Sequence, residues 1–141
     1  MFNGSATNQR KAPDALVDFG KKCIGSLLND VKGIHFVMLG TTDGFELASV
    51  HKNTLPNSGK LAAVSSSILA MVTAFMGEIQ LSGCQTITLE AEDGKAILTA
   101  IAAQKYHMIL VTITQKDVLI GQLLHEIKRI EKDIITASQS L

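Results

Sequence analysis

Serines and carboxylates are the side chains of this sequence best suited to catalysis, and their spacing assembles no familiar catalytic motif. Residues 65–67 are three consecutive serines within a helical pattern, and they lack the G-x-S-x-G arrangement that exposes a nucleophile. Glu90, Glu92 and Asp93 cluster where an Asp-Gly pair predicts a turn, so strand alternation and turn chemistry explain them more simply than acid–base catalysis. We therefore expect a protein that is not an enzyme.

The histidines form no local metal-binding motif. None stands three or four positions from another histidine or a cysteine; the four are His35, His51, His107 and His125. Ligands converging from distant segments stay open, but His35 and His107 lie in strand patterns, where hydrogen-bonded sheet residues are the simpler explanation. The Ser-Gly-Lys segment at 58–60 matches only the end of the phosphate-binding pattern G-x-x-x-x-G-K-[ST], and Leu61 follows where a hydroxyl is needed. We expect neither a metal nor a cofactor.

Composition excludes several classes of partner. The thirteen basic and thirteen acidic residues give a net charge of zero, so nucleic acid is not expected as a partner. The 141 residues are enough for one domain with a hydrophobic core.

Cys23 and Cys84 lack metal or redox spacing and are expected to be buried. The first residues lack the apolar stretch of a signal peptide, which predicts a cytoplasmic protein. We expect residues 1–12 to be a flexible tail and 13–141 to be a single domain.

Hydrophobic periodicity predicts the order α-β-β-α-β-β-β-α. Helical spacing begins after Pro13 and ends at Gly33, and returns over 61–77 and from about Lys116 and Asp117 onward. Strand patterns cover 34–40, 45–51, 86–91, 95–103 and 107–114, joined in two places by Asp-Gly turns. The predicted fold is α+β: a five-stranded antiparallel sheet with the two amphipathic helices on one face and the middle helix on the other.

The middle helix is unusual because it carries no charge from Leu61 to Gly77. One stripe is expected to cover the core: Leu61, Val64, Ile68, Met71, Val72, Phe75 and Ile79. The opposite stripe is small or apolar and is expected to bind a protein partner: Ala62, Ser66, Leu69, Thr73 and Met76. A membrane span would need about 20 apolar residues, and this run is shorter and interrupted, so membrane insertion is not expected. Burial inside a single chain stays open as the plainer alternative.

The strand at 86–91 is the most polar of the five and resembles a sheet edge. Thr86, Thr88 and Glu90 alternate with Ile87 and Leu89. An edge strand of this kind can meet water or pair with another chain. We therefore count Thr86, Thr88 and Glu90 with the expected interface.

The element order and several short motifs resemble the Roadblock family, which includes dynein light chains of that name and bacterial MglB-like regulators of small Ras-like GTPases. The resemblance covers about residues 14–135. It is carried by GIHFVMLGTTDGFELA at 33–48, Asp93-Gly94 and LIGQLLHEIKRI at 119–130. It implies a homodimer, or a heterodimer with a related chain, formed by the middle helix and the third strand. It also implies a non-enzymatic regulator or scaffold that binds a small GTPase and modulates its nucleotide cycle.

Two other functions stay open at this point. A PAS-like sensor domain would enclose a small molecule between sheet and helices, although the sheet residues here offer few convergent polar groups. A purely structural adaptor would share the dimer surface and differ only in its client. If the helix faces are assigned correctly, Leu69→Asp separates a dimer and leaves the monomer folded.

Overall fold

A five-stranded antiparallel sheet organises the computed structural model, which describes residues 12–55 and 57–141. The strands are β1 (Ile34–Thr41), β2 (Glu46–His51), β3 (Thr86–Glu90), β4 (Gly94–Ala102) and β5 (His107–Gln115), in the spatial order β2-β1-β5-β4-β3. The helices of the described residues are α2 (Asp14–Asp30), α3 (Leu61–Glu78) and α4 (Ile120–Gln139), with a short 3-10 turn at Ser58–Lys60. The predicted fold class and element order are confirmed.

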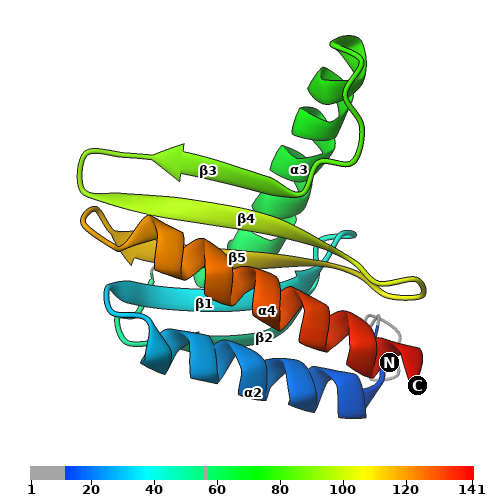
Figure 1. Cartoon of the computed structure of the whole chain (residues 1–141), viewed down its shortest axis with the longest axis horizontal. Coiled ribbons are helices and arrows are strands. Elements are labelled where there is room, and N and C mark those ends of the chain that lie inside the picture. The colour runs from blue at the N-terminus through cyan, green and yellow to red at the C-terminus, as the bar shows by residue number, and fades with distance from the viewer. Residues whose placement is uncertain (1–11, 56) are drawn as a thin grey trace.

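Helices α2 and α4 lie side by side on one face of the sheet (Figure 1). The larger core fills the space beneath them with aliphatic side chains, among them Leu16, Ile24, Leu39, Leu110, Leu123 and Ile127. Gly20 lets α2 approach β1 closely, because a Cβ at this position would lie 2.6 Å from Cδ2 of Leu39. This face is fully covered over its central strands and leaves the edge strand β3 outside the helices.

The opposite face carries a smaller core beneath the first turns of α3. Its buried members are Phe36, Met38, Ala62, Leu98, Ile109 and Val111. Gly44 in the β1–β2 turn has a φ of 101° and lies against α3, where a Cβ would come within 3.3 Å of Cα of Ala63. The start of α3 is therefore fixed to the sheet by small residues on both sides of the contact.

Several predicted boundaries differ from the structure. Helix α4 begins at Ile120, because the amide of Gln115 donates to the carbonyl of Gly33 (2.8 Å) and prolongs β5, after which Val118 forms a turn. Ala12, expected to belong to the tail, is buried in the larger core. The rest of the expected tail, residues 1–11, lies outside the described residues.

Candidate partner interface

Helix α3 touches the sheet only with its first half. Ala62 and Ser65 are buried, and Leu61, Ile68 and Leu69 pack against the smaller core. Figure 1 shows the second half of the helix rising past β3, the edge strand, beyond the rest of the domain. The helix therefore presents to solvent a length of chain that its own domain does not cover.

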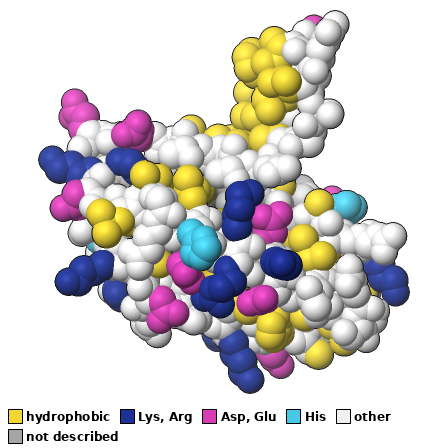
Figure 2. Space-filling view, in the orientation of Figure 1, with side chains coloured by type: hydrophobic (Ala, Val, Ile, Leu, Met, Phe, Trp, Pro, Cys, Tyr) yellow, Lys and Arg dark blue, Asp and Glu magenta, His cyan; other side chains and the backbone are white. Residues whose placement is uncertain are grey.

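A stripe of exposed hydrophobic side chains runs from the first turn of α3 along its projecting half to the residue after the helix. Val64, Met71, Phe75 and Ile79 are 52%, 71%, 62% and 49% exposed. Figure 2 shows hydrophobic side chains gathered on one side of this projection. We call these four residues the apolar stripe. They were expected to cover the core, and that assignment is wrong for these four, because Ala62 and Leu69 of the opposite side pack on the sheet together with Leu61 and Ile68.

The residues predicted to form the outer face divide into two groups. Ala62 is buried against the sheet, so its expected role at a partner interface is wrong. Ser66 donates a hydrogen bond to the carbonyl of Thr42, and Leu69 packs on the smaller core, so both already have contacts within the chain. Thr73 is exposed and Met76 is half-buried on the projecting half, and their contact with a partner stays a prediction.

The strand residues predicted for the interface lie at a free edge of the sheet. Thr86, Thr88 and Glu90 are all exposed, and β3 is the last strand in the sheet order. They pair with Thr99, Ile97 and Lys95 of β4 and so share the sheet face with α2 and α4. The Glu90 carboxylate lies 3.4 Å from the Lys95 ammonium group. The edge position inferred from the polarity of this strand is confirmed.

An open hollow of about 350 Å³ lies near the β3–β4 turn. A row of apolar side chains from three adjacent strands forms part of its lining: Leu89, Ala96 and Ile113. Ala96 and Ile113 also pack against the smaller core, so the row belongs to the sheet face that carries α3. Sequence reasoning missed this hollow, although the alternation of Ile87 and Leu89 is the signal for an apolar face on β3.

Two of the three serines, Ser66 and Ser67, and one of the histidines considered for chemistry have structural hydrogen bonds. Ser67 donates to the carbonyl of Ala63 (3.2 Å), and Nδ1 of His35 lies 3.0 Å from the amide nitrogen of Asn53. Among the described residues, no group of three or more His, Cys, Asp or Glu side chains could hold a metal.

The two cysteines, expected to be buried, are both half-buried. Burial raises the pKa of the Cys23 thiol, and the nearby Asp133 carboxylate raises it further. Cys23 therefore holds its proton more tightly than a free thiol, which disfavours a nucleophilic role.

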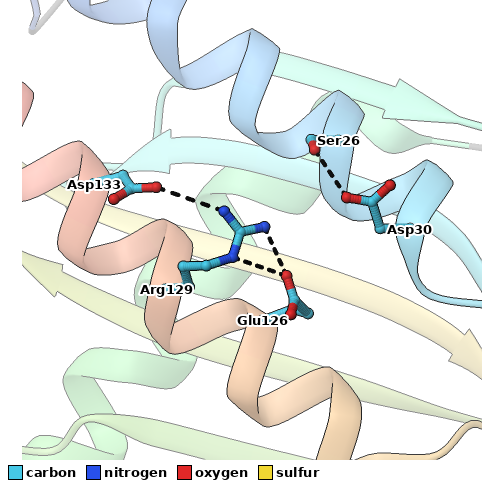
Figure 3. Close-up of polar contacts among 5 residues, drawn as sticks. All are labelled: Ser26, Asp30, Glu126, Arg129 and Asp133. Carbon is cyan, nitrogen blue, oxygen red and sulfur yellow. Dashed lines mark hydrogen bonds and ion pairs between the residues drawn. The ribbon is translucent and has the colours of Figure 1, made fainter.

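Arg129 lies on α4 and is held by carboxylates on its own helix (Figure 3). Its Nε and Nη2 both donate to Oε1 of Glu126, at 3.0 and 2.6 Å, and its Nη1 lies 3.8 Å from Asp133. The hydrogen bond to Glu126 raises the pKa of the guanidinium group, so it stays charged. Because α4 covers the opposite face of the sheet, Arg129 is remote from the apolar stripe.

The segment Ser58–Glu78 has the length and composition of a membrane-spanning helix, with a mean hydropathy of 1.5. Its first turns, however, pack against the sheet of their own domain. This packing holds the start of the helix within the domain and leaves the remainder exposed.

Fold and surface together define a small α+β domain with one projecting apolar helix and one free strand edge. The chain belongs to the Roadblock/LC7 domain family, whose model matches residues 24–114. Among curated protein sequences no relative matches.

Solved structures share this fold. The gliding protein MglB of Thermus thermophilus superposes with a TM-score of 0.80 at 15% identity, covering 92% of this chain and 95% of that one. MglB of Myxococcus xanthus gives 0.80 at 15% identity, covering 88% and 90%. A Roadblock/LC7 domain from Streptomyces avermitilis gives 0.71 at 14% identity, covering 81% and 92%. The chain is thus similar to these proteins in fold over nearly its whole described length.

Proposed function

We propose that this protein is a non-enzymatic, dimeric regulator or scaffold that binds a small Ras-like GTPase. The observation that carries the proposal is the apolar stripe on the projecting half of α3, beside the free edge of β3. Burying a side chain such as Phe75 or Met71 stabilises an association by about 1.5–3 kcal/mol each. A surface of this kind, next to an unpaired strand, fits a protein partner.

A second copy of the same chain fits the geometry. Since α3 rises past β3, pairing the two β3 edges sets each projecting helix beside the sheet of the other copy. The hollow lined by Leu89, Ala96 and Ile113 is then available to the partner helix. One structure similar to this chain, with a TM-score of 0.80, is described as "MglB with tetrameric arrangement", so a relative of this fold assembles into multimers.

The GTPase client follows from the Roadblock resemblance, whose bacterial members include regulators of Ras-like GTPases. The paired α3 helices and the loops beside them supply the binding surface in this proposal. Arg129 is tied to Glu126 on the other face of the sheet, so this chain is not expected to supply an arginine finger. An effect on hydrolysis or exchange would come from ordering the switch loops of the GTPase.

Light scattering across a dilution series, followed by size-exclusion chromatography with purified small GTPases, tests the proposal. We expect twice the chain mass, and co-elution with a GTPase in one of its two nucleotide states. A dimer that binds no GTPase in either state would favour the structural adaptor. A monomer at all concentrations, carrying a co-purified small molecule, would favour the PAS-like sensor and overturn the dimer.

A further inference from the structure

The apolar stripe contains one side chain that a dissolved oxidant can change. Met71 is 71% exposed, whereas the methionines of the two cores, Met38 and Met108, are 0% and 1% exposed. Met76 is half-buried on the projecting half of α3. An oxidant reaches a thioether only where solvent reaches it. Of the methionines in the described part of the chain, Met71 is therefore the one that reacts first.

A peroxide oxidises a methionine thioether to the sulfoxide by transferring one oxygen atom. With hydrogen peroxide, a lone pair of the Met71 sulfur attacks one oxygen, so that an S–O bond forms while the O–O bond breaks. The departing oxygen takes the proton of the transferred hydroxyl and leaves as water. The sulfur loses two electrons and the peroxide gains them. The reaction needs no catalytic group from the protein, only access to the sulfur.

The new oxygen atom is a hydrogen-bond acceptor in the middle of an apolar surface. The other members of the stripe are Val64, Phe75 and Ile79, whose side chains have no hydrogen-bond donor. Water solvates the sulfoxide in the free chain, and covering the stripe removes that water without replacing its hydrogen bonds. The loss is expected to weaken the association about tenfold for each oxidised chain, and about a hundredfold when both chains are oxidised.

Oxidation and assembly compete for the same side chain. In the proposed dimer the stripe is covered, so Met71 reacts chiefly in chains that have dissociated. Each oxidised chain re-associates weakly and stays exposed. The rate of oxidation of Met71 should therefore fall as the protein concentration rises, a dependence that an exposed methionine outside the interface would not show.

We infer that Met71 is a redox-sensitive modification site, at which oxidation by a peroxide releases the dimer and enzymatic reduction of the sulfoxide restores it. The site rests on the dimer proposed above and adds a reversible covalent control to it. Its substrate class is a small peroxide, and its product is methionine sulfoxide on α3.

Two matched variants of the whole chain test the site. Leucine is close to methionine in volume and has no sulfur, so Met71→Leu should dimerise like the natural chain and stay dimeric after hydrogen peroxide. Met76→Leu keeps Met71 and should dissociate after the same treatment, as the natural chain does. Light scattering across a dilution series gives the mass and the dimer Kd. Peptide mass spectrometry locates the added oxygen.

Reversal separates methionine oxidation from cysteine oxidation. Cys23 and Cys84 also react with peroxides, but dithiothreitol alone reduces their sulfenic acids and disulfides. The oxidised chain should stay dissociated in dithiothreitol. It should dimerise again once the two methionine sulfoxide reductases, one for each epimer, are added. Met71→Gln places a polar amide in the stripe without an oxidant and should raise the dimer Kd about tenfold or more.

Each other outcome overturns the redox site in an identifiable way. A natural chain that carries oxygen on Met71 and keeps its dimer Kd would show that the sulfoxide is tolerated. Equal dissociation of Met71→Leu after peroxide would place the sensitive group elsewhere. A rate of Met71 oxidation that is the same well below and well above the dimer Kd would show that the dimer leaves this side chain uncovered. These three results leave the proposed dimer standing, whereas an untreated natural chain that is monomeric would contradict the proposed function itself.

Discussion

At the scale of the residue, two buried hydroxyl groups stand out. Within the described part of the chain, Oγ1 of Thr99 and Oγ1 of Thr112 are buried and have no hydrogen-bond partner. Thr112 pairs with Val37 and Ile97 on the neighbouring strands, so its hydroxyl lies among aliphatic side chains beneath α2 and α4. A buried hydroxyl without a hydrogen-bond partner lowers the free energy of unfolding by about 1–3 kcal/mol, because it loses its bonds to water. A methyl group of the same shape has no such bonds to lose.

Thr112→Val is therefore expected to raise the free energy of unfolding by about 1 kcal/mol, because it replaces the unpaired hydroxyl with a methyl group. Urea unfolding at a fixed protein concentration measures the change. Thr114→Val is the matched control: Thr114 is buried two residues further along β5, but its Oγ1 donates to the carbonyl of Gln115 (2.8 Å). The control should lose stability. A loss for Thr112→Val as well would mean that its hydroxyl has a partner in solution.

Sequence reasoning at this scale was most successful where local pattern decides the outcome. The Asp-Gly turn and the free edge at Thr86, Thr88 and Glu90 followed from alternation and turn chemistry. The unpaired hydroxyls of Thr99 and Thr112 could not be predicted, because threonine is a common strand residue and its partners depend on tertiary packing.

At the scale of the element, sequence periodicity predicted where α3 begins and ends but not which of its sides faces the sheet. Its bounds were predicted closely, and its lack of charge indicated a helix without a solvated face. Periodicity could not decide which side meets the sheet, since both sides are free of charge. Packing decided it: Ala62 and Ser65 allow a close approach to the strands, and bulkier Phe75 and Met71 point outward.

Phe75→Asp is expected to separate the dimer and leave the monomer folded, because Phe75 is 62% exposed and belongs to the apolar stripe. Light scattering should give the mass of one chain, and circular dichroism should be unchanged. Ala70→Asp is the matched control: Ala70 is exposed on the same helix, roughly 140° around it from Phe75, and its variant should stay dimeric. Separation by both variants would mean that helix charge, rather than the stripe, controls assembly.

The same packing changes the expectation for Leu69→Asp. Leu69 packs against the smaller core of its own domain, so an aspartate there would be set against Phe36, Met38 and their neighbours. This variant is now expected to destabilise the monomer along with the dimer. Its effect would not test the interface alone.

At the scale of the whole molecule, the arrangement of layers and the antiparallel direction of the strands were predicted from the sequence and are confirmed. Helices α2 and α4 each have one apolar side for the sheet and one polar side for water, so both were expected to cover one face of the sheet. Helix α3 was expected on the other face, and the structure agrees. The projection of α3 past β3 was beyond sequence reasoning. It depends on where the helix crosses the strands, and Gly44 and Ala62 set that crossing through close contacts.

A protein of this shape should become more heat-stable as its concentration rises, because dimerisation stabilises only the folded chains. We expect the Tm of the natural chain to increase across a hundredfold range of concentration, measured by circular dichroism. Phe75→Asp, monomeric throughout, should show a Tm that does not change with concentration. A constant Tm for the natural chain would contradict a dimer that dissociates in this range.

The projection of α3 also bears on how long a newly made chain survives. With the dimer proposed above, the final step of maturation is the meeting of two chains, so its rate falls with the square of the monomer concentration. Until then the outer turns of the helix lie beyond the sheet of their own domain, which leaves them open to local unfolding and to proteases. At a low concentration of new chains, degradation of the monomer would be faster than dimerisation. At a high concentration, dimerisation would be faster. The amount of dimer in the cell would therefore depend steeply on the rate of synthesis.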